Sequence, residues 1–242
     1  MERLSNDALS VAQRLAVIRE EIERACAQAG RRPQEVSLLA VTKTVEPARI
    51  NEAIAAGASM IGENRAQELL SKLPDLQIAG QPPVGVHFIG HLQTNKVKSI
   101  IDQVDLIQSL DSIGLAKEID RQAAMHGKVM PVLVEVNIGK QESKSGVYRE
   151  DLLNFLEQIA AFSHIRVDGL MCIPPICDTE AQRRKYFSSM YDLFIDIRAQ
   201  NMDNGSMNIL SMGMSGDFRE AILEGSTMVR IGSALFGQRE YK

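Results

Sequence analysis

Short and nearly continuous apolar runs recur along the chain, separated by segments of different character. Eight of these runs predict β-strands, at residues 36–43, 58–64, 84–91, 104–110, 130–138, 165–173, 207–215 and 227–237. Four of the segments between them have apolar residues at helical spacing, at residues 47–57, 112–127, 149–162 and 184–200. A further helix is predicted over residues 6–29, because apolar residues recur there every three or four positions and Gly30 follows as a stop signal.

Alternating strands and helices predict a parallel sheet with helices packed against it. Eight strands in 242 residues fit a (β/α)8 TIM barrel. We expect a single domain over residues 1–242, which includes the additional N-terminal helix. The strands are apolar on both faces, as in parallel sheets that are covered on both sides. A doubly wound open sheet has the same alternation and remains an alternative. However, no G-x-G-x-x-G motif follows the first strand, which disfavours dinucleotide binding.

Composition and charge indicate the cellular compartment and the kinds of binding partner to expect. The net charge is −4, whereas a general nucleic-acid binder is normally basic. The three cysteines are scattered, which favours a reducing compartment. The N-terminal segment is charged and lacks the apolar stretch of a signal peptide, and no uncharged apolar run is long enough to span a membrane. We therefore expect a cytoplasmic protein that binds neither nucleic acid nor membrane.

Polar and small residues stand at the carboxyl ends of the predicted strands. In a barrel these ends meet on one rim, where active sites form. Because polar residues follow most strands in any fold, only the residue types can identify a site here. The residues concerned are Lys43, Glu63, Asn64, His91, Gln93, Asn95, Ser109, Asp111 and Asn137, with "GMS" and "GS" after the last two strands.

Two familiar chemistries fit the sequence poorly. His87 and His91 have the spacing of helical zinc ligands, but they lie in a predicted strand, where four residues span about 13 Å. No G-x-S-x-G motif is present, which disfavours a serine nucleophile of the hydrolase type. We therefore expect neither a metal site nor serine catalysis.

Phosphate binding fits better. Each of the last two predicted strands runs into a glycine-containing turn and then a segment that can open a helix: "GMSGDFREAI" and "IGSALFG". Glycine lets the backbone approach an anion, and the N–H groups at a helix start favour negative charge. In (β/α)8 barrels the phosphate site is frequently built from these two loops.

Two cationic residues would lie at the same end of the barrel as these loops. Arg230 precedes Gly232 by two positions, so both face the same side of the last strand. A buried arginine needs an acceptor, either a carboxylate such as Glu63 or Asp217 or a bound cofactor. Lys43 ends the first strand, and partial burial would lower its pKa and free the neutral amine. Such an amine beside a phosphate site suits an imine with pyridoxal phosphate, or equally an aldolase acting on a sugar phosphate.

Eight motifs in order carry a resemblance to a known family. They are "LLAVTKT", "IGENRAQE", "HFIGHLQTNK", "SLDS", "VNIGKQESKSG", "GLMCI", "SMGMSGDFREAI" and "GSTMVRIGSALFG". From about residue 36 to residue 240 the chain resembles the pyridoxal-phosphate homeostasis protein family, which is similar to the barrel domain of bacterial alanine racemase.

The resemblance implies a set of cofactor-binding residues and no catalytic or metal residues. Lys43 matches the lysine that forms the internal aldimine with pyridoxal phosphate, and Asn64 matches a residue that lines the pocket. Arg230 matches the arginine facing the pyridine nitrogen. The residues that match the phosphate cradle are Ser215 and the backbone at Gly232 and Ser233.

The resemblance also implies a role. Family members are mostly monomeric, have no firmly established turnover, and are thought to hold pyridoxal phosphate, deliver it to apo enzymes and keep cofactor and amino- and keto-acid pools in order. The alternative is an amino-acid racemase or another pyridoxal-phosphate-dependent enzyme. An arginine at the ring nitrogen weakens the ring as an electron sink, whereas transaminases and most decarboxylases have a carboxylate there. Racemases tolerate an arginine but need a second base, usually a tyrosine, which none of the predicted strand ends supplies.

The chain departs from the family at one informative position. Many relatives carry a second lysine two residues after the cofactor lysine, where this chain has Val45. Lys144, in the loop after the fifth predicted strand, is a second amine at the rim, although a solvated loop lysine would look the same.

Overall fold

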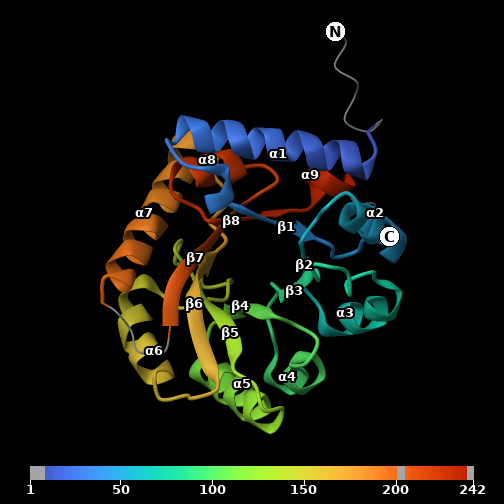
Figure 1. The fold of residues 1–242 in the computed structure, drawn as a ribbon. Coiled ribbons are helices and arrows are strands. Elements are labelled where there is room, and N and C mark those ends of the chain that lie inside the picture. The colour runs from blue at the N-terminus through green and yellow to red at the C-terminus, as the bar shows by residue number, and fades with distance from the viewer. Residues whose placement is uncertain (1–8, 201–204, 239–242) are drawn as a thin grey trace.

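Eight parallel strands close into a barrel in the computed structural model, which describes residues 9–200 and 205–238 (Figure 1). Each strand pairs with the next one in sequence, and β8 pairs with β1. The strands are β1 (Ser37–Val41), β2 (Met60–Glu63), β3 (Gly85–Phe88), β4 (Leu106–Leu110), β5 (Met130–Val136), β6 (Ile165–Cys172), β7 (Gly205–Met214) and β8 (Met228–Ile231).

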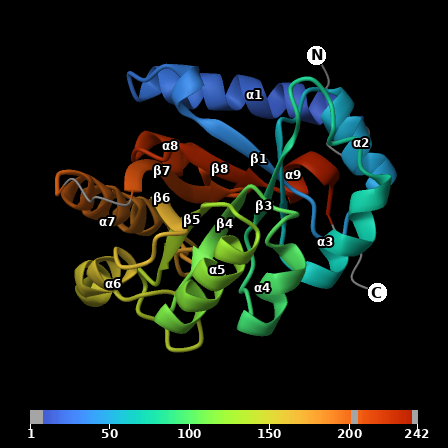
Figure 2. The same cartoon turned by 60° about the horizontal axis from the view of Figure 1, so that its bottom comes forward.

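Helices surround the barrel on its outside, and α1 lies across one side of it against α8 and α9 (Figures 1 and 2). The α-helices are α1 (Val11–Gln28), α2 (Pro47–Ala55), α3 (Ala66–Lys72), α4 (Thr94–Ile100), α5 (Ile113–Met125), α6 (Leu152–Ile159), α7 (Glu180–Arg198), α8 (Phe218–Leu223) and α9 (Ser233–Phe236). Short 3₁₀ turns are η2 (Pro33–Glu35), η3 (Leu73–Asp75) and η4 (Arg149–Asp151). No helix in the described part of the chain is long and apolar enough to cross a membrane.

The predicted (β/α)8 barrel is confirmed, and the open sheet is wrong because β1 and β8 are paired. The N-terminal helix is confirmed with a later start. It begins at Val11, where the prediction placed its start at residue 6, because Ser10 and Gln13 form a capping box that satisfies the first backbone N–H groups. Residues 6–8 lie outside the described part of the chain.

Other boundaries differ from the prediction for local reasons. The last strand ends at Ile231, and the segment predicted to continue it forms α9. Both α3 and α4 contain seven residues, which is two turns and too short for a periodic pattern to predict.

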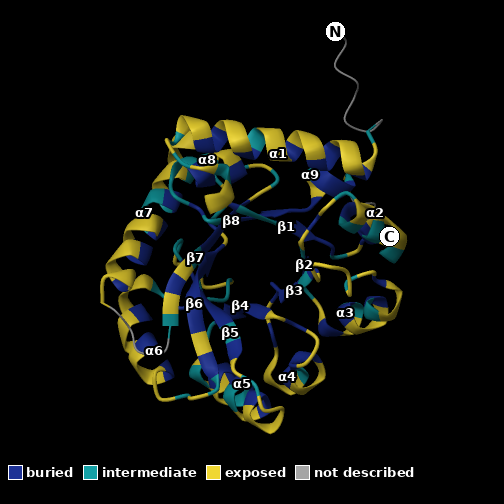
Figure 3. Ribbon diagram, viewed as in Figure 1, coloured by how far each residue is buried: buried dark blue, intermediate teal, exposed yellow. Residues whose placement is uncertain are grey.

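The pattern of burial is that of a barrel whose outside is covered by helices. Most strand residues are buried, apart from exposed positions on β6 and β7, whereas the helices expose their outer faces (Figure 3). Most of the core lies between the strands and the helices, and smaller clusters fill the barrel interior. Leu39, Val41, Ile89 and Met228 form one of these interior clusters. Lys43 follows Val41 by two residues, so the alternation of side chains along a strand carries its side chain to the mouth of the barrel.

Candidate functional site

A pocket of about 540 Å³ opens at the carboxyl ends of strands β1, β2, β7 and β8, within the range of small-molecule sites, about 300–1,000 Å³. Its walls include four apolar side chains, those of Val41, Ile89, Ile173 and Met214. The structure brings together in this pocket all six residues predicted to bind a cofactor: Lys43, Asn64, Ser215, Arg230, Gly232 and Ser233.

One side of the pocket concentrates hydrogen-bonding groups of the loops after β7 and β8. The backbone N–H groups of Gly232 and Ala234 both donate to the Ser215 hydroxyl oxygen, at 3.1 and 3.2 Å. The loop that carries Ser215 is closed by Asp217, whose carboxylate accepts from the Met214 N–H at 2.6 Å. Burial raises the pKa of Asp217, although this hydrogen bond acts in the opposite direction. The hydroxyl and the N–H groups thus gather at one edge of the pocket, where donors of this kind favour an anion.

Asn64 lies on the opposite side of the pocket, directly after β2. The loop after β3 passes close to its backbone, because Gly90 has no side chain. A Cβ atom on Gly90 would lie 2.3 Å from the Asn64 carbonyl oxygen, so any larger residue there would displace Asn64.

Arg230 is buried inside the barrel, with 4% of its surface exposed. Its Nη1 donates to the Ser211 carbonyl and hydroxyl oxygens, and its Nη2 donates to the Cys172 carbonyl, each at 2.8 Å. These bonds use three of the five N–H donors of the guanidinium. The proposed ion pair with Glu63 is wrong, because Glu63 is bound by Lys72 on the side of β2 that faces α3. Burial lowers the pKa of Arg230, against the influence of nearby Cys172, Glu135 and Asp217.

Deeper in the barrel, a series of buried, hydrogen-bonded polar side chains supports Arg230. The Ser211 hydroxyl donates to Gln108 Oε1 at 2.7 Å, and Gln108 Nε2 lies 2.9 Å from His87 Nδ1. Burial lowers the pKa of His87 to about 4, so the ring is neutral at pH 7 and Nδ1 accepts from the Gln108 amide. Each member orients the next, and the orientation of Arg230 is therefore set by side chains deep in the barrel.

The sequence alone did not identify Gln108 as part of the site. A glutamine in the middle of the apolar run "DLIQSL" does, however, indicate a buried amide that needs hydrogen-bond partners.

Glu135 is a second residue that the sequence analysis missed. It lies on β5, two residues after the interior Leu133 and therefore on the same inner side of the barrel. Burial raises the pKa of Glu135 to about 7, helped by the charge of Asp111 and opposed by Arg230, His91 and Lys144. An acidic residue inside an apolar strand is the signal that could have identified it.

Several other residues near the rim have structural partners, whereas the Ser109 hydroxyl is buried without one. Asn137 holds the loop after β5 through hydrogen bonds with Gln141 and with the Lys144 carbonyl, at 2.8 to 3.2 Å. Lys144 donates to the Pro174 carbonyl at 3.1 Å and is not among the residues that line the pocket. His91 Nδ1 lies 3.3 Å from Asp111.

No group of three or more His, Cys, Asp and Glu residues suited to a metal ion occurs in the described residues.

Comparison with known proteins places the chain among close relatives. The model of the alanine racemase N-terminal domain family matches residues 14–240. The chain is 42% identical over 236 residues to a pyridoxal phosphate homeostasis protein of Aquifex aeolicus, covering 96% of this chain and 100% of that protein. It is 35% identical to the protein of that name from Escherichia coli, over 96% of this chain and 97% of that one.

Solved structures agree in fold. The structure of PipY from Synechococcus elongatus with pyridoxal phosphate bound superposes with a TM-score of 0.81 at 32% identity, covering 94% of this chain and all of that one. Alanine racemase from Corynebacterium glutamicum gives a TM-score of 0.66 at 19% identity, over 94% of this chain and 62% of that one. At that identity the second likeness concerns the fold alone.

The raised pKa of Glu135 predicts that the stability of the folded chain depends on pH. The folded chain keeps its proton up to about pH 7, whereas the unfolded chain releases it near the ordinary value of 4.5. The stability contributed by this group is therefore full below pH 4.5 and is lost as the pH rises to about 7. The Glu135→Gln variant lacks this loss, so we expect it to gain stability relative to the natural chain across that window.

Urea unfolding of both proteins at several pH values measures the effect. The Glu142→Gln substitution, at an exposed position after the same strand, serves as the matched control. A difference between the Glu135→Gln variant and the natural chain that stays constant with pH would contradict the raised pKa.

Proposed function

The chain belongs to the pyridoxal phosphate homeostasis protein family, and on that premise we propose that it binds pyridoxal phosphate in the mouth of its barrel and helps to maintain the supply of this cofactor. One observation carries the proposal. An amine, a hydroxyl with converging backbone N–H groups, and a buried guanidinium face a single pocket from opposite ends of the chain. Relatives named for pyridoxal phosphate homeostasis match this chain over nearly their whole length.

The residues present fit the chemistry of the cofactor part by part. The Ser215 hydroxyl and the backbone N–H groups at Gly232 and Ser233 would hold the phosphate, since a doubly charged anion is favoured by several converging donors. The apolar side chains of Val41 and Ile89 would pack against the ring. The unused N–H donors of Arg230 would face the ring nitrogen.

When bound, pyridoxal phosphate supplies an aldehyde that condenses reversibly with a primary amine. Lys43 would provide that amine, because it lines the pocket that also contains the phosphate cradle. A covalent bond that water can reverse suits a protein that must both retain and release its cofactor. Enzymes that lack their pyridoxal phosphate are the recipients that such a role requires.

The environment of the ring favours holding over turnover. Arg230 has donors only and keeps its proton, so it cannot protonate the ring nitrogen. Enzymes that draw electrons into the ring benefit from a carboxylate at this position. None of the tyrosines in the described residues lines the pocket, and a racemase-type second base is therefore not supplied there.

Lys43 gives the first test of this proposal. We expect the natural chain to trap pyridoxal phosphate irreversibly on borohydride reduction, and the Lys43→Ala variant to trap almost none, because the amine is gone. Peptide mass mapping of the reduced protein locates the adduct. The Lys144→Ala variant is the matched control and should react normally. Undiminished trapping by the Lys43→Ala variant would move the attachment point, with Lys144 examined next.

Ser215 gives a test that isolates the phosphate. Loss of a hydrogen bond to a charged group costs about 1.5–3 kcal/mol, so we expect the Ser215→Ala variant to bind pyridoxal phosphate about tenfold more weakly or worse. Pyridoxal, which lacks the phosphate, should bind both proteins equally. Fluorescence or absorbance titration measures both ligands. An equal loss of affinity for the two would argue that Ser215 shapes the pocket instead of holding phosphate.

The distinction between holder and racemase has its own measurement. We expect the protein loaded with pyridoxal phosphate to leave the α-hydrogen of L- and D-alanine in place in heavy water, beyond the slow exchange caused by free pyridoxal phosphate. Proton NMR follows the signal over time. Fast exchange by the natural chain, lost in the Lys43→Ala variant, would favour a racemase.

A further inference from the structure

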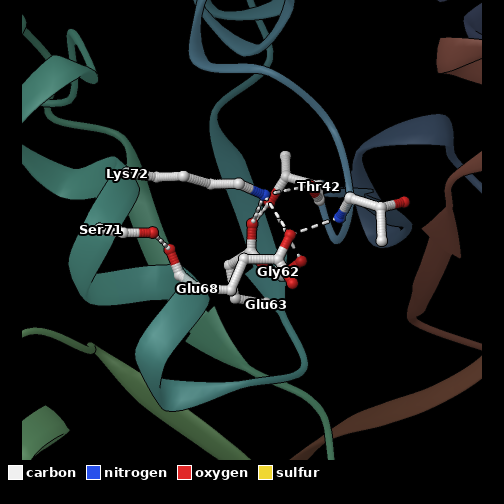
Figure 4. A network of polar contacts seen from close by, with 7 residues as sticks. Thr42, Gly62, Glu63, Glu68, Ser71 and Lys72 are labelled. Carbon is white, nitrogen blue, oxygen red and sulfur yellow. Dashed lines mark hydrogen bonds and ion pairs between the residues drawn. The ribbon is translucent and has the colours of Figure 1, made fainter. Parts of the chain in front are cut away.

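A buried ionic cluster surrounds Thr42, the residue before Lys43, between strands β1 and β2 and helix α3 (Figure 4). At its centre is Lys72, the last residue of α3, with only 10% of its side chain exposed. Its ammonium group donates to the Thr42 carbonyl at 2.8 Å, to Glu63 Oε1 at 2.9 Å and to Glu68 Oε1 at 2.6 Å. All three N–H bonds of the ammonium therefore have an acceptor.

The cluster holds the residue before Lys43 at two points. The Thr42 carbonyl accepts from Lys72, and the Thr42 hydroxyl donates to Glu63 Oε1 at 2.7 Å. Glu63 itself is fully buried on β2. Because Thr42 is engaged through both its main chain and its side chain, the end of β1 has little freedom to rotate.

The cluster also holds the residue after Lys43. The backbone N–H of Thr44 donates to Glu68 Oε1, the same oxygen that accepts from Lys72. Thr44 has a φ of 61°, in the left-handed region that branched residues avoid. The chain therefore turns sharply just after Lys43, and the hydrogen bond to Glu68 stabilises this unfavourable turn.

Such a cluster is not what barrel stability alone would favour. A buried set of charges is frequently no more stabilising than well-packed apolar residues, whereas removal of one partner leaves another charge unpaired. Glu63 Oε2 is buried with no hydrogen-bond partner. Burial raises the pKa of Glu63 despite Lys72, whereas for Glu68 the bonds from Lys72 and Thr44 outweigh burial and lower the pKa.

We propose that Lys72 is a positioning residue for Lys43: with Glu63 and Glu68 it fixes the backbone on both sides of Lys43, so that the Lys43 amine projects into the pocket. The inference rests on the proposed function, in which Lys43 is the attachment point. Lys72 does not touch the pocket and acts only through the Thr42–Thr44 backbone. Displacement of a reacting group by 1 Å can reduce a rate about 100-fold.

The first variant to examine is Glu68→Ala. It removes the acceptor for Thr44 and one partner of Lys72, but leaves the Lys72–Glu63 pair intact at a site where Glu68 is 20% exposed. Glu68→Gln keeps an acceptor oxygen and tests rescue. Lys72→Met removes the centre of the cluster. Ser71→Ala, in the same helix, is the matched control, since its hydroxyl donates to the Glu68 carbonyl and not to the carboxylates of the cluster.

Two readouts are taken on the full chain of each variant. The first is the pH profile of Lys43 acetylation by acetic anhydride in the absence of pyridoxal phosphate, mapped by peptide mass spectrometry with exposed Lys117 as internal reference. The second is the rate at which Lys43 captures pyridoxal phosphate. The melting temperature of each variant identifies the range in which it is folded.

We expect Glu68→Ala to shift the acetylation profile of Lys43 but not that of Lys117, and to slow capture at least about tenfold, with Lys72→Met showing the larger effect of about 100-fold. Glu68→Gln should restore most of the rate, and Ser71→Ala should match the natural chain.

A folded Glu68→Ala variant whose Lys43 profile and capture rate are both unchanged overturns the inference, whatever its melting temperature. If Lys72→Met fails to fold, Glu68→Ala alone decides. If the natural chain captures no pyridoxal phosphate at Lys43 but Glu68→Ala still shifts the acetylation profile, the proposed function fails and the positioning role of the cluster is supported.

Discussion

The pairing of β1 with β8 is the constraint on which the rest of this molecule depends. It sets Leu39 opposite Arg230 and Ala40 opposite Ile231, in parallel register. Lys43 and Gly232 lie just beyond these pairs, so residues almost two hundred positions apart in sequence share one pocket. Without closure, the amine at the end of the first strand and the cradle after the last two would have no common site. Parallel closure also directs every strand's carboxyl end to the same rim.

The pocket is stiffened from two independent directions. Below it, the chain from His87 through Gln108 and Ser211 fixes the guanidinium of Arg230 within an otherwise apolar barrel. Behind it, the cluster around Lys72 fixes the backbone that carries Lys43. Both use buried polar groups, which are favourable only when their partners are in place. The site is thus preorganised by interactions that lie outside the pocket itself.

The sequence predicts the repeating framework well and the supporting interactions poorly. Eight apolar runs with helical segments between them were sufficient for the barrel, but the open sheet could be rejected only when β1 was seen beside β8. The six pocket residues were accessible because each stands at a strand end or within a recognisable motif. For Gln108 and Glu135 the sequence signals a buried polar side chain but not its partners, which lie on other strands. The role of Lys72 has no signal at all, because it depends on Thr42 and Glu63 from other elements. In sequence, Lys72 is indistinguishable from a solvated lysine at the end of a short helix.

The place of Gly232 in the chain order has a consequence for synthesis. A polypeptide is made from its N-terminus, so the amine of Lys43 exists long before its partners. The loops after β7 and β8 come last, and β8 must emerge from the ribosome before the barrel can close. Until β8 has been made, the nascent chain therefore carries a lysine without the proposed anion cradle beside it. Under the proposed function, tight capture of a phosphorylated ligand can begin only after β8 has been made, so the same pairing that closes the fold also times the appearance of the site.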